Sequence, residues 1–188
     1  NNFKDTELIM ENCAIVGNYM IKGRSYGDIS LDDNATVLYC WWGQNNISPY
    51  YYSPHDGDHR PDKINASRWL VMTFSANDGV VYMNKNNVLT VDLNYYYDNE
   101  TKEIRKLDGS VNLPLEVTVY TTSTRITKKL ENGVATFNIK PESYDELVYA
   151  KIDNQKMELA VTSKYSTLIV NDFNKYYKIR YSFCFFYP

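Results

Sequence analysis

The amino-acid sequence predicts an all-β protein in which the last coils and the cap of a parallel β-helix are joined to an antiparallel β-sandwich. Apolar residues alternate with polar ones in short runs along most of the chain, and no long segment has the helical period of about 3.6 residues. Tyrosine and asparagine, present in 18 and 20 copies, suit strands and the turns between them. Two similar segments near the N-terminus also recur at the spacing of a solenoid coil.

Length and composition exclude several classes of protein. A chain of 188 residues, 44% of them hydrophobic, buries a sizeable core without disulfides or metal ions. Its 20 Lys and Arg residues against 23 Asp and Glu residues give a net charge of −3, which provides no basic surface for nucleic acid. No apolar run is long enough for a transmembrane helix, and residues 1–5 do not begin a secretion signal. We therefore expect a piece of a longer protein without a membrane span.

The first region is predicted to span residues 1–62. Residues 8–18 and 37–45 each combine an apolar run, a cysteine, a large or apolar pair, and then glycine and asparagine. The separation between the cysteines of the two segments, Cys13 and Cys40, is close to the length of one coil of a parallel β-helix. A pair of ordinary hairpins whose cysteines and glycines match by chance is the alternative. Prolines and polar residues after residue 45 predict a connector that ends the region.

The second region is predicted to span residues 63–162 as a sandwich of about seven short strands. In residues 88–95 the apolar side chains alternate with polar ones, which places Val91, Leu93 and Tyr95 inward and Asn94 outward. Further strands are expected at 69–74, 80–83, 113–120, 134–139, 147–152 and 157–161, with hairpin turns at 131–133 and 153–155.

Three segments, in this order, resemble the adhesin-like surface proteins of methanogenic archaea. Residues 41–45 (Trp-Trp-Gly-Gln-Asn) are similar to the motif that closes the solenoid of that family. Residues 69–73 are similar to its next strand, and residues 133–137 (Gly-Val-Ala-Thr-Phe) to a hairpin of its Ig-like repeat. The resemblance covers residues 8–161. It implies that the first region is the end of a right-handed parallel β-helix and that the sandwich is Ig-like.

Residues 166–173 also resemble the opening strand of a further repeat in that family, but the chain stops after one more apolar stretch. We therefore expect residues 163–188 to be the stub of a following repeat or an extra edge strand. An uncovered apolar strand of this kind would promote aggregation.

The resemblance implies a non-enzymatic, adhesin-like fragment of a larger secreted or wall-anchored protein of an archaeal methanogen. It would present or space a binding region for attachment to other cells, to a host or to a substrate. Its location would be extracellular, its partner a cell-surface protein or a glycan, its state a monomer, and it would need no cofactor. The alternative is a carbohydrate-active protein, either a solenoid polysaccharide lyase or hydrolase fragment or a sugar-binding module.

The densest polar cluster of the sequence lies in the connector and consists of His55, Asp56, Asp58 and His59. These side chains are candidate ligands of a divalent cation. No other histidine is present to complete a zinc site, and the segment is a proline-flanked loop, so a solvated linker is the favoured interpretation.

Catalytic chemistry has little support in the sequence. No Gly-x-Ser-x-Gly turn is present to expose a nucleophilic serine. The residues that could serve a solenoid lyase or hydrolase are more readily explained as a polar turn between coils: Lys22, Arg24, Asp28, Asp32 and Asp33.

Cysteines and tryptophans mark equivalent places in the two proposed coils. Cys13 and Cys40 would lie on neighbouring parallel strands, about 4.8 Å apart, where either a disulfide or a stacked pair of buried thiols fits. Cys184 is left over, and an odd number of cysteines argues against a disulfide framework. Trp41 and Trp42 are expected to cap the solenoid end, which would otherwise expose an apolar interior.

Four Asn-x-Ser/Thr sequons make glycosylation a hypothesis, since each lies in an expected loop or turn. Their acceptor residues are Asn34, Asn46, Asn65 and Asn99.

Two runs of three tyrosines, at 50–52 and 95–97, allow two interpretations. Exposed rings could stack on sugars or on a protein partner, whereas alternate rings of a strand more commonly pack inward.

Overall fold

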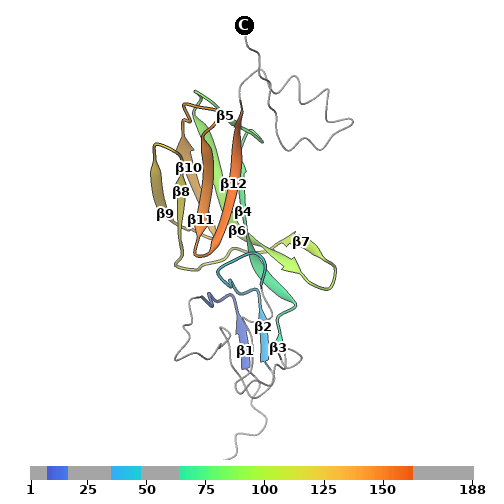
Figure 1. The fold of residues 1–188 in the computed structure, drawn as a ribbon. Helices are drawn as coiled ribbons and strands as arrows, with labels where there is room; N and C mark the ends of the chain where they lie inside the picture. The colour runs from blue at the N-terminus through green and yellow to red at the C-terminus, as the bar shows by residue number, and fades with distance from the viewer. Residues whose placement is uncertain (1–7, 17–34, 48–63, 163–188) are drawn as a thin grey trace, which may run out of the picture.

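The computed structural model describes residues 8–16, 35–47 and 64–162 (Figure 1). These residues form strands and turns and contain no helix, so the predicted all-β class is confirmed for this part of the chain. The strands form a small parallel sheet and two larger, mostly antiparallel sheets. Figure 1 shows the parallel sheet at one end of an elongated molecule, with β5 and the end of β12 at the opposite end.

The parallel sheet consists of β1 (Leu8–Glu11), β2 (Ala35–Leu38) and β3 (Ile64–Asn65), in that order. The first residue of β1, Leu8, pairs with the first residue of β2, Ala35. Ala35 pairs in turn with Ile64, the first residue of β3, at a similar offset along the chain. The three strands thus pair in parallel at a nearly constant offset along the chain.

A bend follows each of the first two parallel strands. Asn12 and Tyr39 occupy equivalent places, each directly after its strand, and both adopt a left-handed backbone with a φ of 53°. After the bend, the parallel pairing resumes with a bridge between Ala14 and Trp41. Because a left-handed residue turns the chain sharply, its repetition shows that the two segments follow the same path.

The third parallel segment lacks this bend and continues into the sandwich. β4 (Arg68–Ala76) begins three residues after β3. Near its start, a parallel bridge joins Trp69 to Cys40. On its other edge, the same strand pairs antiparallel with β6, where Trp69 lies opposite Tyr97. The first residues of β4 therefore belong to both regions of the molecule.

Two sheets enclose the main core. The first has the order β10-β6-β4, with β7 also paired to β6, and the second has the order β5-β12-β11-β8-β9. The strands of the first sheet not yet given are β6 (Asn87–Asp98), β7 (Glu103–Lys106) and β10 (Val134–Ile139). Those of the second are β5 (Val81–Tyr82), β8 (Glu116–Tyr120), β9 (Arg125–Lys129), β11 (Leu147–Ile152) and β12 (Gln155–Thr162).

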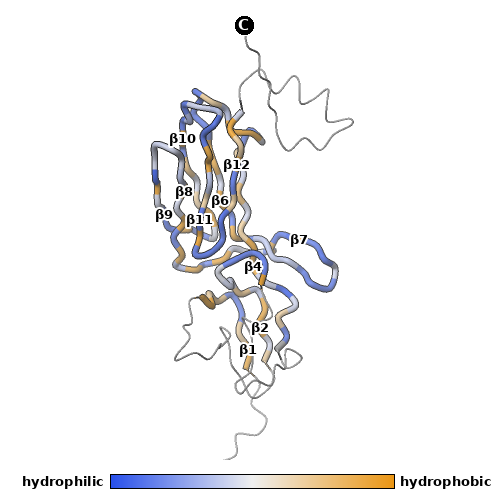
Figure 2. Tube along the Cα trace, in the orientation of Figure 1, coloured by the Kyte–Doolittle hydropathy of each residue, from blue (hydrophilic) through white to orange (hydrophobic). Residues whose placement is uncertain are grey.

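The alternation predicted for the sandwich strands fills its core. Leu89, Val91 and Leu93 of β6 are fully buried, as are Phe137 of β10 and Val117 of β8. The solvent-facing strands are polar, and Figure 2 shows β7 and its turn as a hydrophilic segment. The sequence did not predict β7 or β9, because every residue of β7 is exposed and β9 buries no side chain fully. Without an inward face, such strands lack the period-two pattern.

The predicted outward position of Asn94 is wrong, and a β-bulge explains the error. Between the pairs Val71–Tyr95 and Thr73–Asp92, β6 has one residue more than β4. This extra residue interrupts the alternation, so that Leu93 and Asn94 are both buried.

The buried Asn94 carboxamide bonds to two separate backbone segments inside the sandwich. Its Nδ2 donates to the carbonyl of Asn132 (2.9 Å), and its Oδ1 accepts from the Val111 N–H (2.7 Å). Asn132 and Gly133 have φ values of 51° and 77° and form the predicted tight turn. A Cβ at Gly133 would clash with the Asn94 carboxamide, so both the conformation and the close approach require glycine here.

Glu146 fastens two loops at the far edge of the sandwich. Its buried carboxylate accepts hydrogen bonds from the N–H groups of Thr122 and Glu142, both 3.0 Å long. Burial on its own raises the pKa of Glu146, but these bonds and the Thr121 hydroxyl outweigh it and lower the pKa below its ordinary value.

Candidate functional site at the junction of the two regions

The segment 41–45 carries the Trp-Trp-Gly-Gln-Asn motif and docks on the 153–155 turn between β11 and β12. Three hydrogen bonds join the two segments: Trp41 Nε1 to Asp153 Oδ2 (2.7 Å), Asn154 N to the Gly43 carbonyl (3.0 Å), and Asn45 N to Gln155 Oε1 (2.8 Å). The segments are more than a hundred residues apart in the chain. We call this contact, together with the first half of β4, the junction.

Asn45 extends the edge of β4 where the neighbouring parallel strand has ended. Leu70 N still bonds to the carbonyl of Cys40 (3.0 Å). Two residues later, Met72 N donates to Asn45 Oδ1 (2.7 Å), and Asn45 Nδ2 donates to the Met72 carbonyl (2.8 Å). The carboxamide thus replaces the peptide group of a further strand, because it offers one donor and one acceptor at the same spacing.

The two tryptophans of the motif enter different cores. Trp41 packs in the core of the sandwich with Leu70 and Met72, and Trp42 packs in the smaller core of the parallel sheet with Val71. Both indoles are almost completely buried. Because successive side chains of an extended segment point to opposite sides, one dipeptide fastens both cores.

Gly43 allows the motif to approach Val16, in the segment that follows β1. Its φ is 77°, and a Cβ there would lie 3.0 Å from Cγ1 of Val16. A side chain at this position would be strained by the backbone and would press on Val16.

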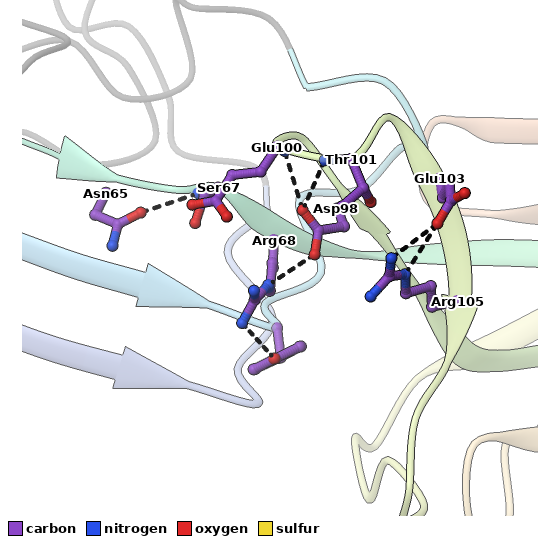
Figure 3. Close-up of polar contacts among 9 residues, drawn as sticks. Asn65, Ser67, Arg68, Asp98, Glu100, Thr101, Glu103 and Arg105 are labelled. Atoms are coloured by element: carbon purple, nitrogen blue, oxygen red, sulfur yellow. Dashed lines mark hydrogen bonds and ion pairs between the residues drawn. The ribbon is translucent and has the colours of Figure 1, made fainter.

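Arg68, the first residue of β4, forms an ion pair with Asp98 at the end of β6 (Figure 3). Arg68 Nε bonds to Asp98 Oδ2 (3.1 Å), and Arg68 Nη1 bonds to the Tyr39 hydroxyl (3.3 Å). Burial raises the pKa of Asp98, but N–H groups of Thr101 and Glu100, together with the guanidinium, lower it below its ordinary value overall. This arrangement joins the left-handed bend after β2 to the end of β6.

A shallow hollow of about 430 Å³ opens beside the junction. Its walls combine carboxamides with apolar and aromatic side chains: Asn45, Asn46, Ile47, Ala66, Trp69, Tyr97 and Asn99. The Trp69 and Tyr97 rings lie 4.8 Å apart, tilted by 39°. Trp69 Nε1 is already bonded to the Asn45 carbonyl (2.7 Å), so the exposed amides of Asn46 and Asn99 provide the available polar atoms of the rim.

The cysteines predicted to be equivalent lie on the parallel-paired segments that follow β1 and β2, and both are free thiols. Trp41 N donates to the carbonyl of Cys13 (2.7 Å), which places Cys40 beside Cys13 in the parallel register. Burial raises the pKa of Cys40 to about 12, and its thiol contacts the carbonyl of Leu38 (3.4 Å). The buried Cys40 and the half-buried Cys13 are therefore neighbours without a covalent bond between them, and both the disulfide and the stacked pair of buried thiols stay predictions.

The tyrosines of the 95–97 run pack on the protein. Tyr96 meets Tyr39 edge to face with ring centroids 5.1 Å apart, and Tyr97 contacts Trp69. Lys106 Nζ lies over the Tyr95 ring at 5.9 Å. This run pairs with the first half of β4 at the junction, and of its three residues only Tyr97 lines the hollow.

Several predicted site residues lie outside the described residues. These are Asn34, the candidate cation ligands His55, Asp56, Asp58 and His59, Cys184, the 50–52 tyrosines, the polar turn of the first coil, and the whole of 163–188. Within the described segments, no group of three or more His, Cys, Asp or Glu side chains could hold a metal ion. Those segments also contain no helix with the length and apolar character that a membrane crossing requires.

The sequence did not predict three features of the junction: the Asn45 bonds to β4, the docking of the 153–155 turn, and the Arg68–Asp98 pair. Asp153 and Asn154 were interpreted only as turn residues. Their second role depends on a long-range contact, and nothing in the local pattern could indicate it.

Comparison with protein-family models, with curated proteins and with solved structures gives no match for this chain.

Proposed function

We propose that the chain is a non-enzymatic, adhesin-like module of a cell surface, which holds a binding region at a distance from its anchor. In this proposal the parallel sheet is the end of a right-handed β-helix, and the sandwich is Ig-like. The location is extracellular and the partner is a surface protein or a glycan. The single observation that carries the proposal is β4, which is shared by both regions without a linker.

Three features support a role in holding and spacing. The described chain starts at the parallel-sheet end of the molecule and leaves β12 near the opposite end (Figure 1). Hydrogen bonds at the 41–45 segment fix the parallel sheet against the β11–β12 hairpin. The buried polar side chains, among them Asn94, Asp98 and Glu146, are bonded to the protein's own backbone.

A measurement of how rigidly the two regions are held relative to one another tests this proposal. Pairs of spin labels, attached through non-natural amino acids at Glu11 and Glu158, report the distance between the two regions. We expect one narrow distance distribution, because β4 and the 41–45 contact leave no hinge. Trp41→Ala, which removes one of the fastenings, should broaden it. A broad distribution in the unaltered chain would contradict a spacing role.

A sugar-binding module is the second candidate, favoured by the hollow beside Trp69 and Tyr97. Aromatic faces with neighbouring carboxamides suit the apolar and hydroxyl faces of a sugar ring. A glycan panel read by tryptophan fluorescence separates the two candidates. A saturable change with one glycan, abolished by Tyr97→Ala, would favour sugar binding, and no change with any glycan would leave the spacing role.

A further inference from the structure

Three sequons from separate parts of the sequence meet at the hollow. Asn46 follows the 41–45 motif, Asn65 ends β3, and Asn99 begins the turn after β6. Asn46 and Asn99 both line the hollow, as does Ala66, the middle residue of the third sequon. Asn99 N donates to the carbonyl of Ser67 (2.8 Å), so the sequons of Asn65 and Asn99 are directly bonded to one another.

The acceptor side chains of these sequons are accessible. Asn46, Asn65 and Asn99 are exposed, as are Glu100 and Thr101. Figure 3 shows Asn65 and Ser67 beside the turn that carries Glu100 and Thr101. Asn99 Oδ1 accepts a hydrogen bond from Lys102 Nζ (2.8 Å). This bond does not involve Asn99 Nδ2, the atom to which a saccharide would be attached.

Other asparagines of the junction and the sandwich contrast with these three. Asn45, Asn87 and Asn94 bond to backbone groups through both ends of their carboxamides. None of the three belongs to a sequon. The asparagines that hold the fold and those available for modification are therefore different residues.

The wall of the hollow suits a sugar ring attached at its rim. Ile47, Ala66 and the half-buried Tyr97 present apolar surface, onto which the C–H face of a sugar ring can pack. The volume of about 430 Å³ lies in the range of about 300–1,000 Å³ that is typical of small-molecule sites. An attached sugar is held close to this surface, so even a weak contact is well occupied.

We propose that Asn46, Asn65 and Asn99 carry N-linked saccharides and that the sugar on Asn99 occupies the hollow against Tyr97. In the modification, Asn99 Nδ2 attacks the anomeric carbon of an oligosaccharide linked to a polyprenyl phosphate. The bond between that carbon and the phosphate oxygen breaks, the phosphate leaves with the electron pair, and Nδ2 loses one proton. The Asn99 carbonyl oxygen is unchanged and keeps its bond to Lys102.

Occupancy of the sites is tested by mass. The full chain is produced in a host that contains an N-oligosaccharyltransferase and in one that lacks it, and its glycopeptides are analysed. We expect sugar at Asn46, Asn65 and Asn99 only in the first host. At Asn99 it should be lost in both Asn99→Gln and Thr101→Val, since the second keeps the asparagine but removes the hydroxyl. Asn138→Gln, at an exposed asparagine outside any sequon, should change nothing. Bare peptides at all three positions would overturn the proposal.

The position of the sugar is tested by quenching of tryptophan fluorescence with acrylamide. Trp41 and Trp42 are almost completely buried and neither lines the hollow, whereas Trp69 does, so Trp69 reports on it. Enzymatic removal of the saccharide should increase quenching in the wild-type chain, and Tyr97→Ala should reduce this increase. A glycosylated chain whose quenching is unchanged by removal would overturn the seating. Protection of the unmodified chain by the free oligosaccharide would also overturn it, in favour of a site for external sugars.

Discussion

The two regions of the molecule differ in how far each could support itself. The parallel strands have four, four and two residues, whereas β4 and β6 have nine and twelve. Two of the residues buried in the parallel region's core, Trp69 and Val71, are contributed by β4. Short strands with a small core of their own gain little stability from local packing. We therefore expect the described part of the parallel region to depend on β4 for its stability.

The dependence is not symmetrical. The sandwich core consists mostly of residues from its own two sheets, to which the 41–45 segment adds Trp41. Loss of the parallel sheet would remove one wall from that core, whereas loss of the sandwich would remove β4 from the parallel sheet. We expect the sandwich to set the global stability and the parallel sheet to unfold locally first.

Replacement of Trp41 by alanine is expected to have the largest effect on this relation. The change removes a fully buried indole from the sandwich core and its bond to Asp153, at a cost of about 3–5 kcal/mol in the free energy of unfolding. Denaturation in urea, followed by circular dichroism, measures the loss.

Trp42→Ala is the matched control, because the adjacent indole lies in the other core. It should accelerate hydrogen exchange at the amides of Ile15 and Trp41 and leave those of β11 and β12 unchanged. If Trp42→Ala shifted the global urea midpoint as far as Trp41→Ala, the two regions would form one cooperative unit.

An intermediate effect is expected from Asn45→Asp, which alters only the edge of β4. A carboxylate cannot donate to the Met72 carbonyl, so one buried acceptor loses its partner and a charge enters the junction. The expected loss is about 1–3 kcal/mol. Asn46→Asp, at the exposed next position, should change stability by less than about 0.5 kcal/mol. Equal losses in both variants, measured in urea, would show that Asn45 does not fasten the strand.

The sequence predicted the features that depend on local pattern. The all-β class followed from alternation, which requires only that one face of each strand is buried. The Asn132-Gly133 turn followed from the positive φ values that these residues accept readily. The equivalence of the two cysteine segments followed from their spacing, and β1 and β2 pair at the same offset along the chain.

The remaining features depend on contacts that no local pattern encodes. The outward assignment of Asn94 failed because a bulge in β6 shifts the alternation by one residue. β7 and β9 were missed because neither has a fully buried face. The hollow arises only when the segment after residue 45, the start of β4 and the end of β6 meet. The sequence singled out the motif at 41–45, but its contact with the 153–155 turn joins residues far apart in the chain and arises only in the folded protein.

The smallest effects are expected from replacing two buried carboxylates. Asp98 lies at the junction and Glu146 in the sandwich loops, and the pKa of each is lowered in the folded protein. A lowered pKa stabilises the fold at a pH above the unfolded value of about 4, and this contribution is lost as the pH falls through the folded value. Acidification below about pH 4 should therefore weaken both regions.

Urea midpoints at pH 5, 4, 3 and 2 test this with two variants. Asp98→Asn and Glu146→Gln should each lower stability at pH 5 and flatten its decline toward pH 2, because the substituted side chain no longer titrates. Hydrogen exchange should locate the first change near β1 and β2 and the second near β8 and β11. Asp108→Asn, at an exposed carboxylate, controls for the removal of one charge. If Asp98→Asn kept the wild-type slope, protonation of Asp98 would not be what weakens the contact between the two regions in acid.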